Sequence, residues 1–324
     1  MEKRGRAFVC DVKPSARFSV RKKEDAINAA IINKLSRAGC VVTAGKKLSG
    51  LSSFSIGGPA DFFIEIPDEK GLSLFLQTAF GQKLRFFVVG GGTNVLFSDK
   101  GYRGAVIKLT GAFKNLSINA ESVSCGAAVS LPLLVKKTAS EGLSGLECCA
   151  GIPGTAGAAV CGNAGSARSW IGDCFTRAEV FSKKGVKSII EKENAGFAYR
   201  TSALKDFIIT KTNFFLKKAA GNDILRSISD SLGKRAASQP LSAANAGCIF
   251  KNPPGLSAGK LIDEAGLKGR KNGGARVSDI HANFIINAGG ASAEDVIGLI
   301  CFVKKAVKDK FNIDLETEIK IIGE

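Results

Sequence analysis

Several features that would assign this chain of 324 residues to a common class are missing from it. No apolar run is long enough to span a membrane, and no apolar stretch follows the basic N-terminus, so we expect neither a membrane span nor a signal peptide. The nine cysteines are irregularly spaced and include no Cys-x-x-Cys pair. This spacing favours reduced thiols in a cytoplasmic protein over a disulfide framework, and it predicts no metal site.

Aromatic residues other than phenylalanine are also scarce, with two tyrosines and one tryptophan. The chain is strongly basic: 46 Lys and Arg stand against 29 Asp and Glu, giving a net charge of +17, a balance compatible with nucleic-acid binding. Residues 1–50 hold 12 Lys and Arg and 4 Asp and Glu, a surplus of +8. Without interleaved aromatic side chains there is no surface on which bases stack. We therefore favour a protein that handles anionic nucleotides over one that binds nucleic acid.

Neither familiar phosphate-binding motif is present. A Rossmann fingerprint would need glycine where Val95 stands, and no Gly-Lys-Ser/Thr phosphate loop occurs. The apolar residues 86–89 nevertheless predict a buried strand, and a glycine-rich segment follows it: Gly90, Gly91, Gly92, Thr93 and Asn94. Glycine leaves backbone N–H groups accessible and reaches φ > 0 freely, so this segment predicts a cradle for a pyrophosphate. A tight turn at a strand end is the alternative.

A second cluster of small residues lies further along the chain, at Gly151-Ile152-Pro153-Gly154 and Gly157. Glycines of this kind permit close backbone approach, either to a ligand or to another segment. Taken alone, packing and binding are equally good interpretations. Two glycine surfaces in neighbouring units favour one ligand lying between them.

Hydrophobic periodicity predicts alternating short helices and strands, with no internal repeat and no low-complexity segment. Helices are expected at residues 26–38, 72–79, 131–141, 221–234, 258–265 and 293–308, the last with a cap from Ser292. Strands are expected at 61–66, 105–109, 116–119 and 122–125, within 178–218, and at 314–322, where polar and apolar residues alternate.

Eight motifs in order carry a resemblance to a known family. They are Ile56-Gly-Gly-Pro-Ala-Asp61, Val89-Gly-Gly-Gly-Thr-Asn-Val-Leu96, Gly151-Ile-Pro-Gly154, Asn163-Ala-Gly165, Tyr199-Arg200, Ala246-Gly-Cys-Ile-Phe-Lys-Asn-Pro253, His281-Ala-Asn-Phe284 and Glu318-Ile-Lys-Ile-Ile-Gly323. Over residues 45–323 the chain resembles the UDP-N-acetylenolpyruvoylglucosamine reductases. Because Gln239-Pro240 follows Tyr199-Arg200 closely, it looks like the short form without a tyrosine-bearing lid.

The resemblance implies an α+β protein with a two-domain FAD-binding fold of the vanillyl-alcohol-oxidase type and a C-terminal α+β substrate domain. The implied division is a basic extension and helix at 1–44, FAD-binding subdomains at 45–104 and 105–220, and a substrate-binding domain at 221–324. The implied reaction is NADPH-dependent, FAD-mediated reduction of UDP-N-acetylglucosamine enolpyruvate to UDP-N-acetylmuramate, a step of peptidoglycan precursor synthesis. We expect noncovalent FAD and a cytoplasmic monomer.

The resemblance also implies roles for individual residues. Arg200 would bind the substrate carboxylate, Glu318 would stabilise the enolate-like charge, and Cys248, where the family usually has serine, would protonate the α-carbon. The expected FAD contacts are Gly90, Gly91, Gly92, Thr93, Asn94, Val95, Gly151, Ile152, Pro153, Gly154, Gly157 and Asn163. The expected substrate contacts are Tyr199, Gln239, Asn245, Lys251 and Asn252.

Each assignment has an ordinary alternative. Cys248 would be inert packing, Arg200 a surface ion pair and Glu318 part of a solvated strand face. Ser55, Ala158 and Thr201 depart from the family pattern. Two rival functions stay open: a flavin oxidoreductase of the same fold acting on a hydroxy acid or sugar lactone, and a basic nucleic-acid-binding protein.

Overall fold

The computed structural model describes residues 31–166 and 169–323, and its first part is a small sheet covered by one helix. The strand order is β1-β2-β5-β3, in which β2, β5 and β3 are parallel and β1 is antiparallel to β2. Asp68 begins the covering helix, because its carboxylate accepts the N–H of Gly71 at 2.8 Å. The elements are β1 (Val41–Ala44), β2 (Ala60–Ile66), α2 (Glu69–Gly81), β3 (Phe86–Val88) and β5 (Tyr102–Leu109).

The second part is an antiparallel sheet of five strands in the order β12-β11-β13-β7-β6. Its core is continuous with that of the first part, since Ile107 of β5 and Cys125 of β7 belong to one buried apolar cluster. The strands are β6 (Leu116–Asn119), β7 (Ser122–Gly126), β11 (Phe175–Phe181), β12 (Lys187–Glu191) and β13 (Ile208–Phe215), and the helices are α3 (Leu131–Ser140), α4 (Ala156–Cys161) and α5 (Ile171–Cys174).

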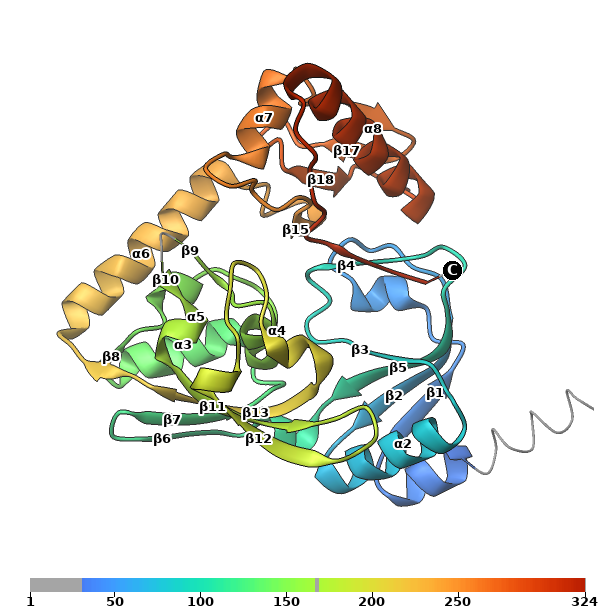
Figure 1. Cartoon of the computed structure of the whole chain (residues 1–324), viewed down its shortest axis with the longest axis vertical. Helices are drawn as coiled ribbons and strands as arrows, with labels where there is room; N and C mark the ends of the chain where they lie inside the picture. The colour runs from blue at the N-terminus through green and yellow to red at the C-terminus, as the bar shows by residue number, and fades with distance from the viewer. Residues whose placement is uncertain (1–30, 167–168, 324) are drawn as a thin grey trace, which may run out of the picture.

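A long helix, α6 (Gly221–Ser238), runs along the outer edge of the second part and reaches the third (Figure 1). Ile224 is its one fully buried residue. Short elements complete the first and second parts: β8 (Leu143–Ser144) paired with β14 (Lys217–Lys218), β9 (Gly165–Ser166) paired with β10 (Ser169–Trp170), and the 3-10 helices Leu48–Leu51, Gly111–Lys114, Glu147–Cys149, Lys192–Asn194 and Ala203–Asp206.

The C-terminal part, at the top of Figure 1, is a four-stranded antiparallel sheet with two helices, and its apolar core also takes in Phe54, Ile56 and Leu96 of the first part. A capping box begins its last helix, in which Ser292 and Asp295 exchange hydrogen bonds of 3.0 Å. Asp99, from the first part, accepts the N–H of Ala293 at the same helix end at 2.8 Å. The elements are β15 (Ala244–Cys248), α7 (Ala258–Glu264), β16 (Lys271–Asn272), β17 (Ala275–Val277), β18 (Phe284–Asn287) and α8 (Ala293–Phe311).

The last residues return to the first part of the molecule. A strand across 314–322 was expected, and this prediction is wrong in extent: β19 covers Lys320–Ile322 and pairs in parallel with β4 (Val95–Phe97). Before β19, the N–H of Glu318 donates to Ile249 O at 2.8 Å. The segment thus contacts two different parts in turn, so it cannot keep one strand register along its length.

Most predicted elements are confirmed within a few residues. The helix expected at 26–38 is observed over 31–37, and residues 26–30 lie outside the described part of the chain. The sequence did not predict the strands β1, β4, β8 to β10 and β15 to β18 or the short helices α4 and α5. The proposed limit at residue 104 stays a prediction; because β5 crosses it and pairs with both β2 and β3, we propose that the first subdomain extends to Leu109.

Two features bear on function. Among the helices in residues 31–166 and 169–323, none combines the length and apolarity that a membrane crossing requires. The same residues contain no cluster of three His, Cys, Asp or Glu side chains arranged to hold a metal ion.

Candidate active site

The predicted cradle is the loop between β3 and β4, residues 90–94. Within the described chain, no hydrogen bond from the backbone N–H groups of Gly90, Gly91, Gly92, Thr93 and Asn94 to another protein group is found. Gly92 is buried, where backbone donors are nearly always paired, whereas Gly91 and Asn94 are exposed, so the loop presents a run of N–H groups that a ligand can reach. They form the kind of surface that binds phosphate oxygens.

The second glycine segment lies directly against this loop. A Cβ atom added at Gly91 would lie 2.7 Å from the Cα of Gly154, and one at Gly90 would lie 2.9 Å from Thr155 Oγ1. The hydroxyl of Thr93 donates to Pro153 O at 3.4 Å. The two segments that the sequence singled out are therefore neighbours, and both need glycine for their contact.

Three further residues expected to contact FAD have other surroundings. Val95 is buried in the first part. The N–H of Gly157 donates to Ala127 O at 2.9 Å, and a Cβ there would lie 2.6 Å from Ala127 Cβ, which supports the packing interpretation. Asn163 is 5% exposed, and its amide donates to Ala198 O at 3.1 Å and accepts the N–H of Gly172 at 3.1 Å.

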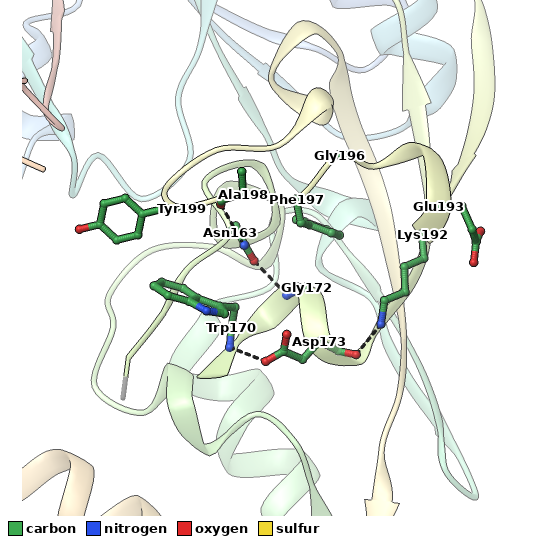
Figure 2. Close-up of a pocket in the computed structure, with 10 residues that line it drawn as sticks. All are labelled: Asn163, Trp170, Gly172, Asp173, Lys192, Glu193, Gly196, Phe197, Ala198 and Tyr199. Carbon is green, nitrogen blue, oxygen red and sulfur yellow. Dashed lines mark hydrogen bonds between the residues drawn. The ribbon is translucent and has the colours of Figure 1, made fainter. Parts of the chain in front are cut away.

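Asn163 supports the turn that carries Tyr199 and Arg200 (Figure 2). The turn is closed by reciprocal hydrogen bonds between Ala198 and Thr201 of 3.0 and 3.3 Å. At its tip Arg200 has φ +57°, in the left-handed region that non-glycine residues rarely occupy. Such strain persists where surrounding contacts enforce it, and it is common at functional sites.

Beside this turn is a pocket of about 600 Å³ (Figure 2). Three aromatic residues line it, Trp170, Phe197 and Tyr199, and the rings of Trp170 and Tyr199 meet edge to face at 5.8 Å. The remaining lining residues are Asn163, Gly172, Asp173, Lys192, Glu193, Gly196 and Ala198.

Arg200 and Glu318 form an ion pair, with Nε and Oε1 3.1 Å apart but the N–H not aligned as a hydrogen bond. Their side chains are 26% and 20% exposed, so neither is a freely solvated surface group. The Arg200 guanidinium also lies 5.7 Å from the Trp170 ring centre, and its Nη1 donates to Gly165 O at 3.4 Å. Burial raises the pKa of Glu318, and the Arg200 charge opposes this shift.

Cys248 ends β15 and lies within electrostatic reach of both groups. Burial raises the pKa of its thiol to about 12; the Glu318 charge adds to the shift, and Arg200 and Arg235 oppose it. The thiol is therefore protonated at neutral pH, as a proton donor must be. The structure thus brings Arg200, Cys248 and Glu318 into one cluster from three distant stretches of chain.

The residues expected to bind substrate differ in how many of their polar groups already have partners within the protein. The Tyr199 hydroxyl accepts the N–H of Asn252 at 3.2 Å, which joins the second part to the third. Lys251 Nζ lies 2.5 Å from Glu316 Oε1. The Asn245 amide is occupied by Pro240 O, Ala243 O and the N–H of Gly247.

Gln239, at the end of α6, is half-buried, and its side-chain amide has no hydrogen bond in the described chain. Sequence reasoning missed one residue of this region, Arg235, one helical turn earlier. The helix expected at 221–234 ended before both residues, whereas the observed α6 continues to Ser238 and so includes Arg235 in its last turn.

Comparisons with known proteins agree with this arrangement. A family model described as "FAD binding domain" matches residues 60–187, and one described as "UDP-N-acetylenolpyruvoylglucosamine reductase, C-terminal domain" matches residues 239–322. Together with the mixed helices and strands, these matches confirm the predicted α+β fold class, with an FAD-binding part followed by a C-terminal domain.

Relatives match over nearly their full length. UDP-N-acetylenolpyruvoylglucosamine reductase of Carboxydothermus hydrogenoformans is 42% identical over 286 residues, which cover 87% of this chain and 94% of the relative. The Bacillus subtilis enzyme of that name is 37% identical over 285 residues, with coverage of 87% and 94%. The crystal structure of the Thermus caldophilus enzyme superposes with a TM-score of 0.75 at 36% identity, covering 87% of this chain and 98% of that one.

Proposed function

We infer the function of this chain from one premise, that it belongs to the UDP-N-acetylenolpyruvoylglucosamine reductase family. It is accordingly an FAD-dependent oxidoreductase that reduces UDP-N-acetylglucosamine enolpyruvate to UDP-N-acetylmuramate, a peptidoglycan precursor. We propose NADPH as its hydride donor. A cytoplasmic, monomeric enzyme stays our prediction.

One observation carries the cofactor assignment: the unengaged N–H groups of residues 90–94 beside the 151–154 segment. Backbone donors of this kind neutralise a pyrophosphate without a side chain between them. We propose that Gly90, Gly91, Gly92, Thr93, Asn94 and Gly154 hold FAD there. When bound, FAD supplies the hydride that the β-carbon of the enolpyruvyl ether receives.

We propose that Arg200 and Glu318 stabilise the charge that the reaction creates. As hydride arrives at the β-carbon, negative charge builds on the substrate carboxylate. A guanidinium suits a carboxylate because it offers parallel N–H donors. Glu318, whose pKa burial raises, can donate a hydrogen bond to the same group when protonated.

Cys248 is our candidate for the proton donor. Its S–H bond breaks as a C–H bond forms at the α-carbon, and a thiolate remains on the protein until solvent reprotonates it. A pKa of about 12 keeps the thiol protonated beforehand. A proton donor must lie within reach of the α-carbon. Cys248 ends β15, and the next residue, Ile249, accepts the N–H of Glu318 through its carbonyl, which is compatible with a thiol at the reaction centre.

Tyr199, Gln239, Lys251 and Asn252 are our candidates for binding the diphosphate, uridine and sugar. Asn245 belongs to this group only indirectly, because its amide already supports the turn that precedes β15.

An anaerobic assay of the purified holoenzyme tests the proposal. We expect NADPH to bleach the flavin absorbance, and UDP-N-acetylglucosamine enolpyruvate to restore it with formation of UDP-N-acetylmuramate. Reoxidation by oxygen but not by this substrate, together with turnover of a hydroxy acid or sugar lactone, would instead assign the chain to the rival oxidases. A purified protein without flavin would contradict both.

A further inference from the structure

Trp170 is the single tryptophan of the chain, and the proposed mechanism gives it no role. Its ring nevertheless lies beside the arginine of the reaction centre. The Arg200 guanidinium centre is 5.7 Å from the Trp170 ring centre and 5.6 Å from the Tyr199 ring centre, and the two rings are 5.8 Å apart (Figure 2). The three groups form a nearly equilateral triangle, at a separation over which an aromatic ring attracts a cation.

The backbone that carries the Trp170 ring is fixed at several points. The N–H of Trp170 donates to the Asp173 carboxylate at 2.8 Å, and the N–H of Ile171 donates to Ala164 O at 2.8 Å. Trp170 also pairs with Gly165 across β9 and β10, so closely that a Cβ at Gly165 would lie 2.7 Å from the Trp170 Cα. The ring is therefore attached to backbone that cannot shift without breaking these contacts.

The polar contacts of the Arg200 guanidinium are weak by themselves. Its Nη1 donates to Gly165 O at 3.4 Å, longer than an ordinary N–H···O bond. Its Nε lies 3.1 Å from Glu318 Oε1, but the N–H is not aligned with that oxygen. Among the described residues no hydrogen bond uses Nη2, which is not buried and so can meet a ligand. The orientation of the guanidinium must then depend on the rings beside it as well as on these polar contacts.

We infer that Trp170 is a positioning residue of the reaction centre, whose ring holds the Arg200 guanidinium in the orientation that presents Nη2 to the substrate carboxylate. The β9–β10 hairpin thereby contacts this guanidinium twice, through the Gly165 carbonyl and through the Trp170 ring. This inference rests on the proposed function and deepens it. The ordinary alternative is that the ring only covers the hairpin and that its contact with Arg200 has no consequence for the reaction.

Two substitutions of Trp170 separate these roles. Trp170→Leu keeps an apolar side chain over the hairpin and removes the aromatic ring, whereas Trp170→Phe keeps a ring. Phe302→Ala is the matched control, because the Phe302 ring on α8 lies 4.5 Å from the Arg270 guanidinium, a ring–arginine contact in another part of the molecule. Each variant is purified as holoenzyme and checked for FAD content and melting temperature.

The two half-reactions are then measured by anaerobic stopped flow. For Trp170→Leu we expect reoxidation of reduced flavin by UDP-N-acetylglucosamine enolpyruvate to be roughly 3- to 30-fold slower, the range that corresponds to loss of one cation–π contact. Reduction by NADPH should stay within about twofold of wild type, because the carboxylate of the substrate is absent from that step. Trp170→Phe should recover part of the rate, since phenyl attracts a cation less strongly than indole does. Phe302→Ala should behave as wild type.

A double-mutant cycle shows whether the ring acts through Arg200. In an Arg200→Met background there is no guanidinium to orient, so adding Trp170→Leu should change the reoxidation rate by less than about twofold. A ring that contacts the substrate directly, or that only supports the hairpin, would cost the same in both backgrounds.

Protein fluorescence gives a second measurement that needs no substrate. Because Trp170 is the single tryptophan, its emission reports on this contact alone. Arg200→Met removes the cation beside the indole and should change the emission of the oxidised holoenzyme at equal FAD content, whereas Phe302→Ala should leave it unchanged.

Any of four results overturns the inference: Trp170→Leu reoxidises like wild type, its two half-reactions slow equally, it costs as much in the Arg200→Met background as in wild type, or the emission is the same with and without Arg200. A wild-type enzyme that the substrate does not reoxidise contradicts the proposed function and this inference with it. Normal wild-type turnover combined with any of the four results contradicts the inference alone.

Discussion

At the scale of single residues, the reaction centre shows how burial changes the chemistry of one side chain. A free thiol has a pKa of about 8.5 and is partly ionised at pH 8. The half-buried thiol of Cys248, beside the Glu318 carboxylate, has its pKa raised to about 12. The same sulfur atom is therefore a poor nucleophile and a protonated acid, and these opposite consequences can be measured separately.

Replacing Cys248 tests its role as proton donor. Cys248→Ala should reduce normally with NADPH but reoxidise about 10²–10⁴-fold more slowly with substrate, which is about 3–5 kcal/mol in the barrier. Cys248→Ser should recover much of the rate, because a hydroxyl can fill the same role. Stopped-flow absorbance of each half-reaction gives the answer, with Cys301→Ala, an exposed thiol on α8, as control. An unchanged reoxidation rate in the Ala variant would remove Cys248 from the mechanism.

The thiols should also differ in their rates of alkylation. A hydrogen bond with Cys149 lowers the pKa of Cys148, the two sulfurs being 3.8 Å apart, whereas burial raises that of Cys248 to about 12. At pH 8 a thiol with that pKa is ionised to about 10⁻⁴. Iodoacetamide should therefore label Cys148 well before Cys248, as measured by peptide mass spectrometry over time. Equal labelling rates would contradict the environment described for Cys248.

At the scale of elements, two loops meet where the cofactor is proposed to bind. The 90–94 loop and the 151–154 segment touch through glycine backbones, with the Cβ position of Gly91 2.7 Å from the Gly154 Cα. Positive φ is required at Gly92 (+67°) and Gly154 (+116°), but Gly91 has no such requirement. The constraint at Gly91 is the approach of the other loop.

Gly91→Val should therefore disturb both the loop contact and FAD binding. Its Cβ and branches would push the two segments apart, at a cost of about 1–3 kcal/mol in the free energy of unfolding, as for other overpacked sites. We expect loss of bound flavin, measured from the absorbance ratio of the purified protein. Gly81→Val, where nothing lies within 4 Å of the Cβ position, is the control and should keep its FAD. A folded Gly91→Val protein with stoichiometric flavin would contradict the proposal that the 90–94 loop binds the FAD pyrophosphate.

At the scale of the whole molecule, a few polar contacts join the three parts around the cluster. Asn287 donates to Phe54 O at 3.1 Å and Ser53 to Asn245 O at 2.6 Å, so the C-terminal part is fixed on the first. The first and second parts share one apolar core and a surface ion-pair chain, in which Lys187 contacts Glu69 of α2 at 2.7 Å and Glu179 of β11 at 2.8 Å.

The Lys187 contacts predict a pH-dependent stability. Hydrogen bonding to Lys187 is the main cause that lowers the pKa of Glu179, and the pKa of Lys187 is raised by Glu179 and Glu69. The stabilisation is therefore present between the unfolded pKa values of Glu and Lys. It disappears as pH falls through the lowered pKa of Glu179 or rises through the raised pKa of Lys187. Lys187 and Glu69 are each 43% exposed and Glu179 is 20% exposed, so solvent screens much of the interaction and its size is about 0.2–1 kcal/mol.

We expect Lys187→Met to lower the melting temperature by up to about 3 °C at pH 7. The difference from wild type should shrink below about pH 4, where the carboxylates are protonated. Lys183→Met, an exposed lysine in the same hairpin, is the control. A difference that stayed constant down to pH 3 would show that the lysine stem, and not its charge, stabilises the junction.

The sequence by itself determined the features that depend on a few neighbouring residues. Apolar periodicity located α2, α3, α6 and α8, and Ser292 marked the start of α8, because a helix and its cap need only contacts three and four residues apart. The glycines at 90–92 predicted an accessible backbone, because the absence of a side chain is a property of the residue itself. Ordered motifs supplied the family and the names of the three candidate catalytic residues.

Only the tertiary structure decided what depends on distant segments. The alternating residues 314–322 predicted one strand, yet the segment contacts two different parts of the molecule. Glu318 hydrogen-bonds to Ile249 of the C-terminal part, and the residues of β19 just after it pair with β4 of the first part. Arg235 acquired its neighbours because α6 ends beside the 151–154 segment. The shift of the Cys248 pKa likewise depends on burial by other segments and on charges at positions 200 and 318. Burial and electrostatic coupling depend on distance in space, which residue order along the chain does not contain.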